Sequence, residues 1–373
     1  MLRTAWQFLM YDKPKAIGAM LGVIVAIFLI GQQTGIFIFL TDTMSGLVKH
    51  SQANIWVINK SANDVNRLGT IDNRIGNELH SFKGVDEVRP LVITAAQMKT
   101  QNGDTAPIML IGAQPPEFLG GPWNMVVGND KTLLQEGTVS ADQFDIKNLG
   151  GIKVGDEVEI GGKLVVLKVL TRGARGFGSN YMFTTIDRAR YLGTFPVNKV
   201  SAFLVKTRPN IKPDSVVKEV NSQLTGVRAW TTKKLARSTV SSILSTSGIG
   251  ASIGTLILFA VISGIVIIGL TLYSSAIDRL RDYATMKAIG ATNKYITRLI
   301  LIQAMIIATI GFVIGSALMI GFREGIKNAG VLYHYTTLEW IGFFAVTMLI
   351  SLSGSLFASR RIRKVEPARI FRN

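Results

Sequence analysis

The sequence contains no cysteine and only three histidines among its 373 residues. Without cysteine, disulfide bonds, thiolate metal sites and a cysteine nucleophile are all excluded. The histidines are His50, His80 and His334. None of them has a histidine or acidic residue three or four positions later in a repeated spacing, as metal ligands on a helix would. We therefore expect no metal site, and we expect each histidine to be an ordinary surface or interfacial residue.

Specific signals for nucleotide binding and hydrolysis are also missing. No G-x-x-x-x-G-K-[ST] sequence occurs, and the nearest approach, residues 155–164, lacks both the glycine spacing and the hydroxyl residue. A G-x-S-x-G sequence occurs at residues 250–254, but it lies within a long charge-free apolar run and not between a strand and a helix, so nothing specific supports a hydrolase. The glycine-rich run 171–180 has no Lys-Ser pair and no following helix, which favours a mobile loop over a phosphate cradle. We expect a non-catalytic chain that holds no cofactor of its own.

Charged residues are scarce and mostly of one sign. They make up 17% of the chain against 48% hydrophobic residues, and the mean hydropathy is +0.32. The 41 basic and 24 acidic residues leave a net charge of +17, which a nucleic-acid-binding protein would also show. The basic residues, however, concentrate beside the ends of long apolar runs. This position favours a role in membrane topology, and we expect no nucleic-acid partner.

Four charge-free runs are each long enough to cross a bilayer, for which about 20 helical residues are needed. They cover residues 16–41, 238–277, 299–322 and 340–359. The second run exceeds one crossing, so its membrane part is expected near residues 256–273, with the Ser/Gly-rich stretch before it outside the membrane. The first run is too long for a cleaved signal and no A-x-A site follows it. The sequence therefore predicts four transmembrane helices.

Basic residues in the short connections predict the orientation of these helices. Segments 1–15, 278–298 and 360–373 are rich in lysine and arginine, whereas segment 323–339 balances two basic against two acidic residues. Since short cytoplasmic segments carry the basic excess, both termini are expected in the cytoplasm of a bacterial inner-membrane protein. The expected layout is an interfacial helix (1–15), a first span (16–41), an extracytoplasmic domain (42–246), a second span with an outer extension (247–277), a cytoplasmic segment (278–298), a third span (299–322), a short outer loop (323–339), a fourth span (340–359) and a basic tail (360–373).

The long outer segment has the pattern of an α+β domain. A strand at 54–59, a helix from Val65 to Phe82 and a strand at 85–94 are followed much later by a helix over 216–224 and a strand at 226–231. This repetition predicts two β-α-β halves of one subdomain. Between them, alternating apolar residues around Gly161 and Gly162 predict a hairpin within a small all-β subdomain inserted at about 130–207.

The apolar runs themselves contain no acidic, basic or histidine residue, which argues against an ion-coupled transporter. Gln32 and Gln33, near the outer end of the first run, could contact another subunit or lie at headgroup level. Small residues recur at the spacing that allows helices to approach closely. These pairs predict tight helix packing and self-association into a homodimer: Gly18 and Gly22, Gly31 and Gly35, Gly250 and Gly254, and Gly311 and Gly315.

The first eleven residues predict a helix on the inner membrane surface, because Leu2, Trp6, Leu9 and Met10 share one helical face. Pro14 is expected to interrupt this helix and bend the chain before the first span.

Residues 274–296 predict a charged continuation of the second span that ends at Gly290 and restarts from Thr292. A partner pressing on Tyr283, Met286 and Ile289 would transmit force to the second and third spans. The alternative is an ordinary reverse turn without such a role.

The run Arg281 to Ala291 resembles the coupling segment of MacB/FtsX-type ABC transporter permeases, with Asp282 where that family usually has glutamate. The order of surface helix, first span, large outer domain, three more spans and a basic tail with Pro-Ala within residues 365–372 is also similar. The resemblance implies that an ATPase docks on residues drawn from this segment, namely Asp278, Arg281, Asp282, Tyr283, Met286, Lys287, Ala288, Ile289, Gly290 and Ala291.

The Ile370-Phe371 ending is similar to DevC-type subunits, which lack a fused ATPase. The resemblance implies that two copies pair, that ATP and Mg²⁺ bind to a separate ABC ATPase dimer, and that its closure moves the outer domain by mechanotransmission. It further implies export or efflux of a lipid-like or amphiphilic substrate with a periplasmic membrane-fusion adaptor and an outer-membrane duct. The alternatives are an FtsX-like regulator of a cell-wall hydrolase and a lipoprotein-releasing permease.

Overall fold

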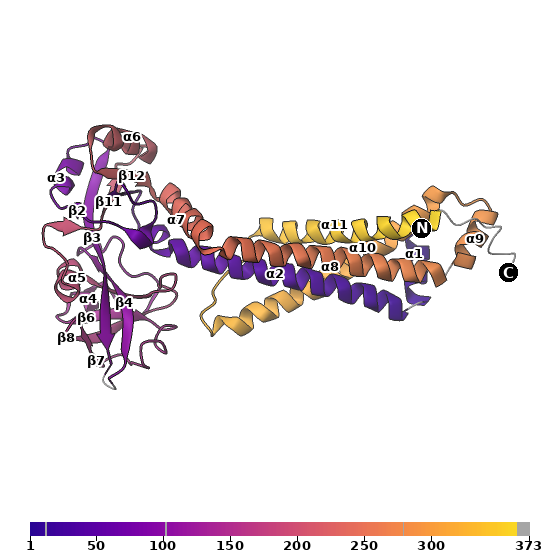
Figure 1. Ribbon diagram of the computed structural model, residues 1–373, viewed down its shortest axis with the longest axis horizontal. Coiled ribbons are helices and arrows are strands. Elements are labelled where there is room, and N and C mark those ends of the chain that lie inside the picture. Colours follow the sequence, from indigo (N-terminus) through magenta and orange to yellow (C-terminus); the bar gives the residue numbers. More distant parts are fainter. Residues whose placement is uncertain (12, 101–102, 279, 364–373) are drawn as a thin grey trace. The chain divides into compact units, whose positions relative to one another are not determined.

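The computed structural model describes residues 1–11, 13–100, 103–278 and 280–363. The chain forms two compact units (Figure 1). The transmembrane unit combines Met1–Phe39 with the chain from Ile249 onward, and the sheet domain is Leu40–Gly248. Each unit has its own hydrophobic core.

Four described helices of the chain are long and apolar enough to span a membrane, which confirms the predicted number. They are α2 (Lys13–Lys49), α8 (Ile249–Asp278), α10 (Asn293–Lys327) and α11 (Thr337–Arg363). Helix α11 packs against both α8 and α10. Two short helices, α1 (Leu2–Tyr11) and α9 (Leu280–Ala288), complete the unit.

The stretch before the second span is a helix of its own. Helix α7 (Thr232–Ser247) buries Leu235, Ala236 and Thr239 in the sheet domain. It ends at Gly248, whose φ of +68° lies in the left-handed region that glycine adopts at helix ends. The Ser/Gly-rich composition therefore marks a helix boundary between α7 and α8.

Glycines allow the helices of the transmembrane unit to approach closely, as predicted. A Cβ atom at Gly311 would lie 2.7 Å from Cγ1 of Val23, and one at Gly315 would overlap Ile27, so α10 lies directly against α2. In the same way Gly22 faces Ile267 of α8. The van der Waals contacts that small residues permit are the main source of helix association in a membrane.

These contacts lie within one chain, so they bear out the predicted helix packing, while the predicted self-association stays a prediction. Gly22, Gly311 and Gly315 face side chains of the same chain, and so do Gly31, which faces Met319, and Gly35, which faces Tyr333 and Tyr335. Gly18 lies 3.8 Å, measured from its ideal Cβ, from Thr271. Of the four predicted pairs, only that of α8 has a glycine facing open space, Gly254, with the half-buried Gly250 one turn before it.

The sheet domain is built on two interleaved β-α-β halves, as the sequence predicts. Strands β12 (Val227–Thr231), β1 (Ile55–Asn59), β11 (Ala202–Thr207) and β3 (Val85–Lys99) lie in this order and pair antiparallel. The chain passes from β1 through α3 (Ile75–His80) to β3, and from β11 through α6 (Pro213–Gln223) to β12. Both helices pack on one face of these strands, where Leu79 and Val216 meet Phe203 in one core.

The predicted single helix from Val65 to Phe82 is wrong. The segment forms a 3-10 turn η1 (Val65–Arg67), strand β2 (Ile71–Asp72) paired with β10 (Lys199–Val200), and α3. Val65 packs with Trp56 in one core, whereas Leu79 and Phe82 pack in the other. The apolar residues at helical spacing therefore serve opposite faces of the sheet, which one straight helix could not reach.

The second half of the sheet contains the predicted hairpin. Strands β7 (Glu157–Ile160) and β8 (Lys163–Thr171) pair antiparallel around Gly161 and Gly162, which both have positive φ. The remaining strands are β4 (Thr105–Ala113), β5 (Met125–Val127), β6 (Thr138–Asp142) and β9 (Asn180–Thr185).

Two details of the predicted insertion need correction. It is not all-β, because α4 (Asp130–Leu134) and α5 (Ile186–Gly193) lie within it. It also ends earlier than residue 207, since β11 pairs with β1 and β3 in the first part of the sheet. The apolar run of β11 does not show which strands it joins.

The glycine-rich run 171–180 is tied to two buried aspartates, Asp142 at the end of β6 and Asp145 just after it. Asp142 accepts hydrogen bonds from the amide of Ala174 at 2.8 Å and from the Thr171 hydroxyl at 3.0 Å. Asp145, only 4% exposed, lies 3.4 Å from Nη1 of Arg175, and its Oδ2 has no hydrogen-bond partner in the described part of the chain. Burial raises the pKa of Asp145 to about 6.

This environment predicts a pH-dependent effect of the substitution Asp145→Asn. Because the pKa is raised in the folded state, the stabilising protonated form is present below pH 4 and is lost as the pH rises through 6. The variant should gain roughly 1–3 kcal/mol of unfolding free energy at pH 7.5 and little at pH 4. Thermal unfolding of the full chain in detergent at both pH values measures this. Asp187→Asn, at an exposed site, is the control, and equal shifts of Asp145→Asn at both pH values would contradict the prediction.

Candidate coupling site

The segment between α8 and α10 has the two helix ends that the sequence predicts. Gly290 follows α9 with a φ of +102°, and the amide of Ala291 donates to the carbonyl of Met286 at 2.8 Å. Thr292 then caps α10, since its hydroxyl accepts a hydrogen bond from the amide of Tyr295 at 3.3 Å. Arg279, between α8 and α9, lies outside the described residues.

One face of α9 belongs to a small core of the transmembrane unit. Tyr283 is 3% exposed, and its ring centroid lies 6.0 Å from that of Phe8 on α1. Ala5 of α1 and Ile296, Leu299 and Ile300 of α10 complete this core, with Met286 at its border. A displacement of α9 must therefore move α1 and α10 or break this packing.

The opposite face of α9 is open. Ile289 is 82% exposed, and the predicted docking residues Arg281, Asp282, Ala288 and Gly290 are exposed as well. Lys287, Met286 and Ala291 are half-buried, and Asp278 has a half-exposed side chain. The prediction that a partner presses on Tyr283 itself is wrong, because its side chain points into the core. Ile289 is a large apolar side chain that a partner can reach.

Helix α1 packs through a different face from the one that the sequence singled out. Ala5 and Leu9 are buried and Phe8 meets Tyr283, whereas Leu2, Trp6 and Met10 are exposed. This exposed apolar strip still suits a membrane surface. Pro14 lies in the first turn of α2, where its missing amide hydrogen costs no helical hydrogen bond, so it starts a helix rather than bending one. Asp12 lies outside the described residues.

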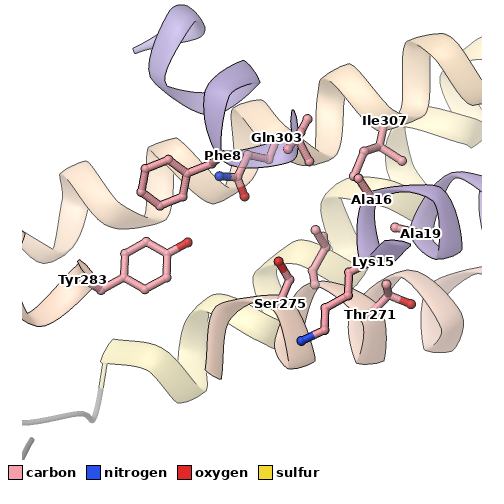
Figure 2. Close-up of a pocket in the computed structure, with 11 residues that line it drawn as sticks. Phe8, Lys15, Ala16, Ala19, Thr271, Ser275, Tyr283, Gln303 and Ile307 are labelled. Atoms are coloured by element: carbon pink, nitrogen blue, oxygen red, sulfur yellow. The ribbon is translucent and has the colours of Figure 1, made fainter. Parts of the chain in front are cut away.

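Polar side chains from four helices gather beside this core (Figure 2). They are Lys15 of α2, Thr271 and Ser275 of α8, Tyr283 of α9 and Gln303 of α10, and together they line a cavity of about 10 Å³. Such a cavity holds roughly one water molecule, so it is no substrate site. Lys15 also forms an ion pair with Asp278 at the end of α8.

This cluster was missed in the sequence. Gln303 is only 7% exposed although it lies in an apolar helix, and Lys15 stands at the edge of an apolar run where a headgroup role is the ordinary expectation. Long-range contacts bring them together, and no local spacing signals those. The one usable clue was the position of a glutamine within a membrane span, where polar residues are costly and usually face other protein groups.

Metal ligands do not gather among the residues that the structure describes, since no group of three or more histidine, aspartate or glutamate side chains lies close enough to hold an ion. His50 stacks on Trp123 with ring centroids 4.7 Å apart and lies 2.9 Å from the carbonyl oxygen of Gly46. These contacts are structural.

Two protein families match the sequence in the order of the two units. The MacB-like periplasmic core domain matches residues 16–223, more than half of the chain, and the FtsX-like permease C-terminal family matches residues 254–367. The chain belongs to the MacB/FtsX-like family of ABC transporter permeases. It is thus a membrane protein with a domain of the MacB periplasmic type. The predicted Pro-Ala motif of the tail lies outside the described residues.

Proteins with similar sequences are also named ABC transporter permeases. Two uncharacterized ABC transporter permeases of Mycobacterium tuberculosis are each 30% identical to it, one over 109 and the other over 114 residues. An uncharacterized ABC transporter permease of Mycobacterium bovis is also 30% identical to it over 109 residues. The matched segments span 28% to 30% of this permease and 29% to 31% of the relatives.

Solved domains of the same kind are similar at low sequence identity. The periplasmic region of MacB from Actinobacillus actinomycetemcomitans is 12% identical, with a TM-score of 0.39, and the match covers 52% of this permease and 94% of that chain. The extracellular domain of the noncanonic ABC-type transporter YknZ from Gram-positive bacteria is 13% identical, with a TM-score of 0.35, over 48% of this permease and 100% of that chain.

Proposed function

We propose that this permease is the membrane subunit of an ABC exporter, in which a separate ATPase dimer moves the sheet domain by pushing on α9. The observation that supports this most is the two-sided character of α9. Arg281 and Asp282 of the helix and Ile289 directly after it are exposed, while Tyr283 is buried against α1 and α10. A helix with one docking face and one packed face can pass a displacement into the helices behind it.

The path from α9 to the sheet domain follows continuous helices. Helix α2 is uninterrupted from Lys13 to Lys49, with Val23 and Ile27 in the core of the transmembrane unit and Leu47 and Val48 in the core of the sheet domain. One continuous helix therefore belongs to both units. The apolar spans need no ion path in this mechanism, because the energy comes from ATP and Mg²⁺ bound to the partner.

The wider setting follows from the same proposal. The permease lies in a bacterial inner membrane with both termini in the cytoplasm and the sheet domain on the other side, and it works as a homodimer. Its cargo is a lipid-like or amphiphilic molecule that it exports, as a DevC-type subunit would, with a periplasmic adaptor and an outer-membrane duct. The length of the sheet domain, Leu40–Gly248, favours export over regulation of a cell-wall hydrolase, which needs less surface outside the membrane.

The test is a gentle detergent purification of the tagged permease from its native membranes, with partners identified by mass spectrometry and the mass of the complex determined. We expect two copies with an ABC ATPase pair and a membrane-fusion adaptor. A cell-wall hydrolase in place of the adaptor would favour the FtsX-like regulator, and a lipoprotein chaperone would favour the lipoprotein-releasing permease. Purification without any ATPase would contradict all three.

A further inference from the structure

The inner ends of α2 and α8 meet along one seam, which closes in an ion pair. Starting from that end, Lys15 pairs with Asp278, Gly18 faces Thr271, and Gly22 faces Ile267. Residue numbers rise along α2 while they fall along α8, so the three contacts belong to one antiparallel register. Glycine on the α2 side lets α8 approach closely, and of these three contacts the ion pair is the one nearest to α9.

We propose that Lys15 and Asp278 form a latch that holds α2 to α8, so that a displacement of α9 is passed to α2 instead of separating the two helices. The proposal rests on the function proposed above and names the residues that transmit the movement. Lys15 and Asp278 are positioning residues in this role.

The position of Asp278 is the first reason. It is the last residue of α8, and α9 begins two residues later at Leu280. A force on α9 therefore reaches α8 at this point before any other. Beyond the packing at Gly18 and Gly22, the ion pair is the contact that ties the last residue of α8 to α2.

The cavity beside the latch is the second reason. Tyr283 from the buried face of α9 lines the same small cavity as Lys15, together with Gln303 of α10 (Figure 2). Four helices thus converge on Lys15. Its side chain is 28% exposed and that of Asp278 is 55% exposed, so the pair is open to water on one side and contributes little to stability on its own. A role in alignment explains the position of the pair better than a role in stability.

The sequence suggested another role for Asp278, direct contact with the ATPase. The two roles differ in what Lys15 should do. A latch needs opposite charges at both positions in either arrangement, whereas an ATPase contact needs a negative charge at residue 278 whatever stands at residue 15.

The experiment uses the permease together with its copurified ATPase in lipid nanodiscs. The chain has no cysteine, so Val197→Cys, at a 78% exposed site of the sheet domain, can carry a single spin label in each copy. The distance between labels is measured without nucleotide and with ATP and vanadate. The variants are Lys15→Gln, Asp278→Asn, the exchange Lys15→Asp with Asp278→Lys, and the control Lys13→Gln, which removes an exposed charge two residues before Lys15.

We expect each single variant to reduce the ATP-driven change in label distance by at least about fivefold, while copurification and the ATPase rate stay within about twofold. The exchange should restore most of the change, and Lys13→Gln should leave it intact. Unaltered movement in both single variants would overturn the proposal. Loss of the ATPase from Asp278→Asn and from the exchange would overturn it too, and would assign Asp278 to docking.

A second measurement separates the latch from the proposed function. Thermal unfolding of the permease alone in nanodiscs is compared for the same variants. The single variants should lower the unfolding temperature only slightly, because the pair is open to water. If the exchange regains this small loss, the ion pair exists without an ATPase. If the wild type then shows no movement with ATP, the proposed function fails and the pair is a static tie, which also overturns its role in transmission. If the exchange regains nothing, the latch is overturned by itself.

Discussion

Ile289→Asp is expected to abolish capture of the ATPase by the permease while leaving the permease folded. The side chain directly follows α9 and is 82% exposed. An aliphatic side chain that fills a pocket at the centre of an interface contributes about 2 kcal/mol or more, and a carboxylate there would also lose its hydration. We therefore expect the affinity for the ATPase to fall by roughly 30-fold or more.

The measurement is the yield of ATPase copurified with the tagged permease, followed by titration of purified ATPase onto the permease in nanodiscs. Ile289→Leu keeps an apolar side chain and should retain most of the affinity. Val197→Asp introduces the same charge at an aliphatic residue of similar exposure in the sheet domain and should have no effect. Normal binding by Ile289→Asp would move the docking surface away from α9.

Gly315→Leu is expected to disrupt the packing of α2 on α10. A side chain at this position would overlap Ile27 and lie close to the carbonyl oxygen of Ile24, 3.5 Å from the ideal Cβ. The helices must separate or shift to admit it, which costs about 1–3 kcal/mol or more for an overpacked core. The unfolding temperature in nanodiscs should fall, and less of the permease should be recovered in folded form.

Gly321→Leu is the matched control, since it makes the same change on the same helix where a Cβ meets nothing within 4 Å. It should leave the unfolding temperature nearly unchanged. The mass of the complex adds a second readout. If Gly315→Leu dissociated a dimer but left the unfolding temperature unchanged, the glycine would serve a contact between copies, and the packing described above would be wrong.

Both outcomes bear on how force would pass through the molecule. Ile289 tests the entry point on α9, and Gly315 tests the contact that joins α10 to α2. Since α2 continues from Lys13 into the core of the sheet domain at Leu47 and Val48, loss of either contact interrupts the same path. ATP-driven movement should therefore be lost in both variants, but only Ile289→Asp should lose the ATPase.

Local patterns in the sequence were enough to predict much of the fold. The four spans follow from apolar length, because hydrocarbon accepts only a segment that satisfies its own backbone hydrogen bonds. The hairpin at Gly161 and Gly162 follows from residues that adopt positive φ. The end of α9 at Gly290 and the cap of α10 at Thr292 follow from the same local chemistry.

Contacts between residues far apart in the sequence could not be predicted from these local patterns. The apolar spacing from Val65 to Phe82 indicated a helix, yet the sheet uses these residues on two opposite faces. The G-x-x-x-G pairs showed that helices approach closely but not which helices, and the structure uses most of them within one chain. Gln303 and Lys15 gave no joint signal at all, because 288 residues of chain separate two side chains that line one cavity.

The sequence by itself determined that this chain is a four-span membrane protein with an α+β domain and a capped segment between its second and third spans, since hydrophobic length, turn residues and helix caps act over a few residues. Only the tertiary structure decided which face of each helix is covered. Tyr283 faces inward and Ile289 outward because α1 and α10 pack on one side of α9, and that choice depends on contacts between segments far apart in the chain.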